Sequence, residues 1–325
     1  MKPFDRIEGT DESWISIIWQ VSDWCNFKCS YCADFSNGGK NKNNFKIDKS
    51  LYNFEQLIVA LKAENYRYFK FNITGGEPTY WNNLLNIVQK FKELLPYKGN
   101  FISLNTNLSR DIEWWKKNYS NFDEVIASYH VEYTDTEQYI STLKFLNDKL
   151  SCVPRIMMKS GYFDQCKVVV NKIKDTLGNY DMELAPVRSE LSNKGKFMDY
   201  TKQELDFLSQ HSGFRKCTSY RHPIKHTRSC VVRNYEREDI NINNIIVQKL
   251  NSFKNWQCNV HENIYIKPNG EIQQSTCGQG SVIGNIFDKI DYSRLINPVI
   301  CKKDFCPCGA DIHNTKFIKE ENGSN

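Results

Sequence analysis

The sequence contains no stretch of about 18 consecutive apolar residues, the length that a membrane-spanning helix requires. Its first residues, Met1 to Arg6, also lack the apolar core of a secretory signal peptide. These absences argue against a membrane protein and make a reducing cytoplasm the expected location, where disulfides are rare. The 12 cysteines among the 325 residues are therefore expected to bind metal or to carry out redox chemistry.

The chain also lacks a large excess of either charge. It has 43 basic and 38 acidic residues and a net charge of +5, which indicates solubility more than a dedicated nucleic-acid surface. One stretch departs from this balance, because seven Lys or Arg and one acid, Glu236, lie between Arg215 and Arg237. This stretch is interpreted either as a contact for an anionic substrate or as a solvated linker.

β-rich apolar segments alternate with helical patterns between residues 14 and 212, which is typical of parallel βαβ units. Capping boxes are expected where Thr134 pairs with Glu137 and where Thr201 pairs with Glu204. Six units rather than eight predict an α/β fold, a partial (β/α)6 TIM-type barrel that is open on one side. The expected strands are Trp14–Val21, Tyr68–Ile73, Phe101–Asn105, Val125–Tyr129, Val153–Met158 and Met182–Val187.

The chain is expected to divide where this pattern ends. Residues 12–212 would form the barrel, residues 213–257 a basic connector, and residues 258–325 a small C-terminal cysteine-rich module of a β-hairpin and α-structure. Pro268-Asn269-Gly270 is the turn signal of that hairpin. Cys152 and Cys166 are expected to be core residues. Cys217 and Cys230 lie in the connector and are expected to have structural roles, with membership of a cluster as the alternative.

Cys25, Cys29 and Cys32 form the most informative motif. Thiolates select iron-sulfur clusters, copper(I) or zinc, and zinc usually has its cysteines in pairs. No histidine lies close to these three thiols in the sequence, so the spacing predicts an iron-sulfur cluster with one iron open to a small molecule. Cys25 and Gly75 each follow an expected strand, so both loops should open onto the same face of the barrel.

With Tyr31 before its last cysteine, this CxxxCxxC motif resembles the signature of the radical S-adenosylmethionine (SAM) superfamily. The run Ile73-Thr74-Gly75-Gly76-Glu77-Pro78 resembles the segment that receives the methionine amino group of the cofactor in this family. The resemblance implies that a [4Fe-4S] cluster at the three cysteines binds SAM and cleaves it to a 5′-deoxyadenosyl radical. Without a Cβ, Gly75 and Gly76 would let the backbone approach a ligand closely and take a positive φ.

Other cofactor contacts match the family pattern less closely. Thr106 and Asn107 resemble the element near the cofactor ribose. Tyr31 would lie against the adenine, or else be an aromatic residue at the mouth of the barrel. Ser128 resembles a serine on the fourth strand, although Tyr129 and His130 follow it where an acidic residue and a glycine are commoner.

Three residues are candidates for substrate contact. His130, at the end of an expected strand, would donate or accept a substrate proton, or else be a polar residue at the barrel rim. Arg188 and Glu190 follow the sixth expected strand and are less specific candidates.

The C-terminal region carries five further cysteines: Cys258, Cys277, Cys301, Cys306 and Cys308. The hairpin is expected to bring Cys258 and Cys277 to the same open end. Together with Gly270 their pattern resembles the auxiliary-cluster domains called twitch and SPASM. A full SPASM module needs more cysteines for two clusters, so the resemblance implies one auxiliary [4Fe-4S] cluster. A zinc ribbon made of four of these thiols is the alternative.

The resemblance implies an enzyme whose radical abstracts a hydrogen atom from a substrate carbon. An auxiliary cluster that accepts an electron favours a net oxidation, by dehydrogenation or crosslinking, of a peptide, sugar or aminocyclitol-like substrate. A flavodoxin or ferredoxin would be the reductant. Two alternatives are a redox-neutral epimerase or rearrangement enzyme, and a zinc-stabilised protein that binds nucleic acid. Nucleic acid is not the expected partner.

Overall fold

The computed structural model describes residues 4–9, 13–32, 47–96, 99–178, 182–187, 199–210, 230–239, 242–295, 298–306 and 308–318. All six expected strands are present, and each is parallel to the next, which confirms the α/β class. They are β2 (Trp14–Gln20), β3 (Tyr68–Thr74), β4 (Phe101–Thr106), β5 (Glu124–His130), β6 (Ser151–Met158) and β7 (Glu183–Pro186).

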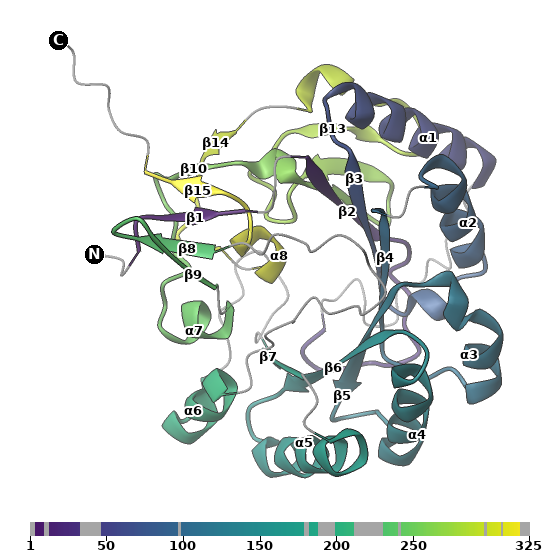
Figure 1. Cartoon of the computed structure of the whole chain (residues 1–325), viewed down its shortest axis with the longest axis vertical. Coiled ribbons are helices and arrows are strands. Elements are labelled where there is room, and N and C mark those ends of the chain that lie inside the picture. The colour runs from purple at the N-terminus through teal and green to yellow at the C-terminus, as the bar shows by residue number, and fades with distance from the viewer. Residues whose placement is uncertain are drawn as a thin grey trace.

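Helices lie between these strands in the chain, and Figure 1 shows α1 to α5 on the outer side of the sheet. The buried residues of α2, Leu84, Ile87, Val88 and Phe91, recur at helical spacing and form the stripe that faces the sheet. Two 3₁₀ turns, Pro78–Tyr80 (η1) and Tyr119–Asn121 (η2), also occur here. The helices are α1 (Ile47–Ala63), α2 (Leu84–Leu94), α3 (Ile112–Asn118), α4 (Thr136–Asn147), α5 (Phe163–Leu177) and α6 (Lys202–Gln210).

One of the two expected capping boxes is confirmed. The backbone N of Thr201 donates to Oε2 of Glu204 at 2.7 Å, and the Glu204 N donates to the Thr201 hydroxyl at 3.3 Å. The other is wrong, because Asp135 caps α4 by accepting from Gln138 N at 3.0 Å. The Thr134 hydroxyl is engaged elsewhere, since it accepts from the backbone N of His130 at 2.9 Å.

The two faces of the parallel sheet differ in chemistry. Alternate residues such as Phe69, Phe71 and Ile73 are buried in the core shared with the helices. The other face carries polar side chains that pair across strands: Asn72 with Ser16, Ser103 with Glu124, and Arg155 with Glu183. The inner side of the barrel is therefore polar.

The expected hairpin is confirmed, and it extends the barrel sheet. β11 (Asn263–Ile266) pairs parallel with β2 and antiparallel with β12 (Glu271–Gln274), and β13 (Val282–Asn285) follows. Gly270 closes the turn with a φ of +84°, which glycine adopts without strain. Within the described residues the end strands β7 and β13 are not paired with each other, so the barrel is open.

A second, antiparallel sheet joins distant parts of the chain, in the order β14-β10-β15-β1-β8-β9. Figure 1 shows its purple strand β1 beside the yellow strand β15. Two short helices, α7 (Ile242–Val247) and α8 (Gly309–Ile312), lie in this part of the chain, as do the 3₁₀ turns η3 (Val260–Glu262) and η4 (Tyr292–Arg294). The strands are β1 (Arg6–Glu8), β8 (Cys230–Arg233), β9 (Glu236–Asp239), β10 (Gln257–Cys258), β14 (Val299–Ile300) and β15 (Lys316–Phe317).

The proposed division at residues 212 and 258 stays a prediction, and strand pairing crosses it. β11 joins the barrel sheet, and β8 of the expected connector pairs with β1. Cys152 and Cys166 are core residues as expected, and Cys230 lies on β8, whereas Cys217 lies outside the described residues. In the described ranges, no helix combines the length and the apolar character that crossing a membrane would need.

Candidate functional site

The three cysteines lie on the loop that follows β2. Cys29 and Cys32 form a tight turn, in which the Cys32 N donates to the Cys29 carbonyl at 3.0 Å, and the Phe27 N donates to the Cys25 sulfur at 3.3 Å. Burial is the main reason that the pKa of Cys25 and the pKa of Cys29 rise to about 12, and the charges of neighbouring thiols raise both further. Buried thiols this close together ionise only with difficulty on their own. A cationic iron centre would stabilise the three thiolates, so the group suits such a centre.

The glycine loop after β3 packs directly against this cysteine loop. The Gly76 N donates to the Ser22 carbonyl at 2.8 Å, and the Glu77 N donates to the Trp24 carbonyl at 2.9 Å. A Cβ on Gly76 would lie 2.0 Å from the Trp24 oxygen, and one on Gly75 would lie 2.7 Å from the Ser22 oxygen. Neither glycine has a positive φ, so that expectation is wrong. The close backbone approach seen here is to the cysteine loop.

Glu77 connects the loops after β3 and β4. Its side chain is 1% exposed, and its Oε1 accepts from the hydroxyls of Thr79 at 2.6 Å and Thr106 at 2.7 Å. Its Oε2 accepts from the Asn107 N at 2.6 Å. Burial raises the pKa of Glu77, although these donors oppose the rise. The carboxylate therefore acts as an internal brace, and Pro78 is buried beside it as the first residue of η1.

Asn107 extends this brace to the cysteine loop. Its side-chain nitrogen donates to Oδ1 of Asn26 at 2.9 Å and lies 3.8 Å from the Cys25 sulfur. The Thr106 hydroxyl accepts from the Leu108 N at 3.1 Å, which fixes the strand end. The residues expected near the cofactor ribose thus lie beside the first cysteine, while their role toward a cofactor stays a prediction.

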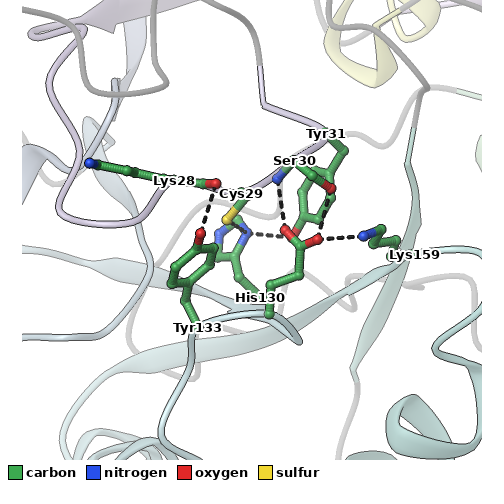
Figure 2. Close-up of polar contacts among 8 residues, drawn as sticks. Lys28, Cys29, Ser30, Tyr31, His130, Tyr133 and Lys159 are labelled. Atoms are coloured by element: carbon green, nitrogen blue, oxygen red, sulfur yellow. Dashed lines mark hydrogen bonds and ion pairs between the residues drawn. The ribbon is translucent and has the colours of Figure 1, made fainter.

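His130 and Tyr31 lie against the second cysteine, as Figure 2 shows. Nδ1 of His130 is 2.8 Å from the Tyr31 hydroxyl and 3.5 Å from the Cys29 sulfur. The rings of His130 and Tyr31 stack at an interplanar angle of 13°, and Tyr31 is 3% exposed. Burial lowers the pKa of His130 to about 4, so the imidazole is neutral at pH 7. The predicted proton transfer by His130 and adenine contact of Tyr31 remain predictions.

The sequence did not predict the ion pair of Glu132 and Lys159, which binds the cysteine loop at Ser30. Glu132 accepts from the backbone N and the hydroxyl of Ser30, both at 2.7 Å, and from Lys159. Burial alone would raise the pKa of Glu132, but these hydrogen bonds and the Lys159 charge lower it. Both residues come within two positions of a strand end, β5 and β6 respectively. The rule that polar residues gather at the carboxyl edge of a parallel sheet would have found them.

Aromatic residues cover the outer side of this loop. The Tyr133 hydroxyl donates to the Lys28 carbonyl at 3.1 Å, and its ring stacks on Phe27 with centroids 5.6 Å apart. Ser128 lies farther down β5, half-buried and in register with Arg155. Arg188 and Glu190 lie outside the described residues.

Residues 19–175, which contain both loops and their braces, match the family model described as the Radical SAM superfamily. These residues form a radical SAM domain. The superfamily binds a [4Fe-4S] cluster and SAM, which are therefore the cofactors of this domain. The three thiols and the glycine loop of this chain fit that pair of cofactors.

Three proteins with different names are similar to parts of this chain. A GTP 3′,8-cyclase from Mannheimia succiniciproducens is 34% identical over 100 residues, or 30% of this chain and 28% of its own length. Streptococcus suis SuiB bound to its precursor peptide SuiA has a TM-score of 0.53 at 15% identity, over 87% of this chain and 64% of SuiB. The structure of anSMEcpe with bound AdoMet has a TM-score of 0.54 at 18% identity, over 85% of this chain and 79% of that one. The two structural likenesses show a shared fold.

Four of the five C-terminal cysteines line one cavity outside the radical SAM domain. Strand pairing explains their convergence, since β10 places Cys258 opposite Val299 of β14 and Cys301 follows directly. The cysteines of the cavity wall are Cys258, Cys277, Cys301 and Cys306. The pairing of β11 with β12 brings in Cys277, as the hairpin predicted. Among the described residues, no three His, Cys, Asp or Glu side chains are arranged to hold a single metal ion.

Cys308 differs from these four. It is not part of the cavity wall, and burial raises the pKa of its thiol. Burial raises the pKa of Cys277 to about 12 and that of Cys258 to about 11. A cluster of iron would again offset the charge of four ionised thiols, so the wall has the donor set for a [4Fe-4S] cluster.

Proposed function

We propose that this protein is a radical SAM enzyme in which Cys25, Cys29 and Cys32 hold the [4Fe-4S] cluster. When bound, the cluster and SAM supply a one-electron reductive cleavage that yields a 5′-deoxyadenosyl radical. The observation that carries the proposal is the direct contact between the cysteine loop and the glycine loop, through two backbone hydrogen bonds of 2.8 and 2.9 Å. This contact holds Gly75 and Gly76 beside the thiols, where the methionine part of SAM would lie.

The braces around the loop have matching roles in this proposal. Glu77 holds Thr106 and Asn107 next to Cys25, in the place proposed for the cofactor ribose. Tyr31 and His130 close the opposite side near Cys29. The strands below offer the polar inner face that includes Arg155 and Glu183, and a substrate that enters the open barrel would meet these groups.

A second cluster at Cys258, Cys277, Cys301 and Cys306 is part of the proposal, in an auxiliary domain of the twitch or SPASM type. It would accept an electron from the substrate radical and so favour net oxidation. A peptide substrate is supported by the likeness to SuiB, which binds a precursor peptide. A sugar or aminocyclitol-like molecule is the alternative. A cytoplasmic flavodoxin or ferredoxin would supply the first electron.

One observation favours a redox-neutral reaction instead. The 34% identity to a GTP 3′,8-cyclase covers 100 residues and links this chain to an enzyme named for forming a ring. Net oxidation and a redox-neutral reaction differ in where the last electron goes. Only in an oxidation does the substrate radical pass an electron to the second cluster. Spectroscopic reduction of that cluster during turnover would separate them. The zinc-stabilised nucleic-acid-binding protein receives no support from the family match.

The test uses full-length protein purified and reconstituted without oxygen. Reduced with dithionite and given SAM, it should release 5′-deoxyadenosine, and the Cys29→Ala variant should not. The Cys230→Ser variant is the matched control, because Cys230 lies on β8 in the second sheet. Replacing Cys25, Cys29 and Cys32 together should remove about four of about eight irons. Release of 5′-deoxyadenosine by Cys29→Ala, or zinc in place of iron, would refute the assignment.

A further inference from the structure

Among the described residues, the half-buried Glu132–Lys159 pair is the ion pair that touches the cysteine loop. The side chains of Lys159 and Glu132 are 17% and 13% exposed. Figure 2 shows Lys159 approaching from the side opposite Tyr133, with Ser30 and Cys29 between them. The two residues come from the ends of neighbouring strands, β6 and β5, so the barrel frame holds them in place.

The position of the carboxylate within the loop is specific. Ser30 is the first residue after Cys29 in the turn that ends at Cys32, and Glu132 takes both of its donors, the backbone N and the hydroxyl. Two contacts at 2.7 Å to one residue fix the orientation of the turn more tightly than a single bond would. Loss of Glu132 would leave the turn its internal bond, from the Cys32 N to the Cys29 carbonyl, and the contacts of Tyr31 and Cys29 with His130, but no bond to Ser30 from a carboxylate.

The carboxylate also places a negative charge close to the thiols. Its oxygens bond to Ser30, the residue directly after Cys29, so the charge lies beside the cysteine turn. A carboxylate beside an anionic cluster disfavours the addition of an electron, because like charges in a poorly solvated site repel each other strongly. Lys159 lies on the same carboxylate and offsets that charge. The cysteine loop therefore gains two hydrogen bonds to Glu132, while Lys159 limits how far the negative charge of Glu132 disfavours reduction of the cluster.

We propose that the Glu132–Lys159 pair positions the Cys29–Cys32 turn for cluster binding and sets the reduction potential of that cluster through its balanced charge. Both residues are positioning residues, since they act through Ser30 and through the local field. The inference rests on the proposed function, in that Cys29 and Cys32 must be cluster ligands.

The two halves of the pair act on the potential in opposite directions. Lys159→Met leaves Glu132 uncompensated, so the cluster becomes harder to reduce. Glu132→Gln leaves Lys159 uncompensated, so the cluster becomes easier to reduce, while one bond to Ser30 is lost. Lys159→Arg keeps the charge and should behave like the unmodified enzyme. A residue that merely supports the fold would move the potential in one direction or not at all.

The experiment measures the midpoint potential of the reconstituted, full-length protein by titration followed with electron paramagnetic resonance. The signal that changes on addition of SAM identifies the first cluster. Iron per chain is measured in parallel, because a variant in which the Cys29–Cys32 turn is displaced should lose up to about four irons. Lys172→Met is the matched control, since Lys172 pairs with Glu137 between the exposed faces of α5 and α4.

Opposite shifts for Lys159→Met and Glu132→Gln, or selective loss of the SAM-responsive cluster in both, would support the inference. Shifts of the same sign, or full iron content with unchanged potentials, would overturn it. If the unmodified protein shows no SAM-responsive signal, the proposed function itself fails. If it does show one and the variants match it, only the role of this pair fails.

Discussion

Substituting Gly76 by alanine should separate the cysteine loop from the glycine loop. The added Cβ would lie 2.0 Å from the Trp24 oxygen and 2.9 Å from the Cys25 N, both of them backbone atoms. Real Cβ atoms essentially never approach closer than 3.0 Å, so the loops must move apart by at least about 1 Å. No side-chain rotation can relieve this contact, because neither atom belongs to a side chain.

The cost follows from what that movement breaks. The hydrogen bonds from Gly76 N to Ser22 and from Glu77 N to Trp24 would be lost, at about 1 kcal/mol each. Overpacking in a rigid surrounding adds about 1–3 kcal/mol. The total, about 3–5 kcal/mol, should lower the Tm of the cluster-free protein by roughly 4–7 °C. The displaced cysteine loop should also fail to retain its cluster.

A series of glycine variants makes the test quantitative. On Gly75 a Cβ would lie 2.7 Å from the Ser22 oxygen, so Gly75→Ala needs a smaller shift and should cost less. Gly309→Ala is the control, because its nearest neighbour, a methyl group of Ile242, is 3.7 Å away. Thermal unfolding of the cluster-free protein and iron content after reconstitution are the measurements. The reasoning is refuted if Gly76→Ala matches Gly309→Ala in both.

Three further predictions concern other parts of the chain. Cys306→Ala should lose about four irons per chain and Cys308→Ala should keep them, and equal losses would contradict the cavity assignment. Lys316→Met should destabilise the cluster-free protein by about 2–4 kcal/mol in urea, because the buried ammonium donates to carbonyls including that of Asn314 at 2.9 Å. An unchanged urea midpoint would show that Lys316 is dispensable. Thr201→Ala should cost about 1 kcal/mol in the same assay, as expected for a lost helix cap, and a gain in stability would be inconsistent with the capping box.

The strands of the barrel could be predicted because their signals are local. Each strand carries buried apolar residues, at alternate positions in β3 and β6, and each strand pairs with the next one in the sequence. The capping error has a local cause too. Thr134 fits the capping-box pattern, but its hydroxyl is engaged by the end of β5, and Asp135 one residue later supplies the cap. Propensity rules do not register such competition between adjacent elements.

The candidate site was predictable only in part. Motif spacing identifies Cys25, Cys29 and Cys32, and their proximity is enforced by a short loop. The Glu132–Lys159 pair has no motif, because its partners are Ser30 and the cysteine loop, more than 100 residues away in the chain. The reason for glycine at position 76 is likewise a contact with Trp24, which lies on a different loop.

The sequence by itself determined the chemistry that this chain carries: two groups of thiols, a glycine loop and the alternation of strands and helices that places them. Those features depend on residue type and short-range spacing. Only the tertiary structure decided which of the five C-terminal thiols share a cavity and that Cys308 lies outside its wall. Convergence of this kind depends on strand pairing between β10, β14 and β15, which distant segments supply and no local pattern encodes.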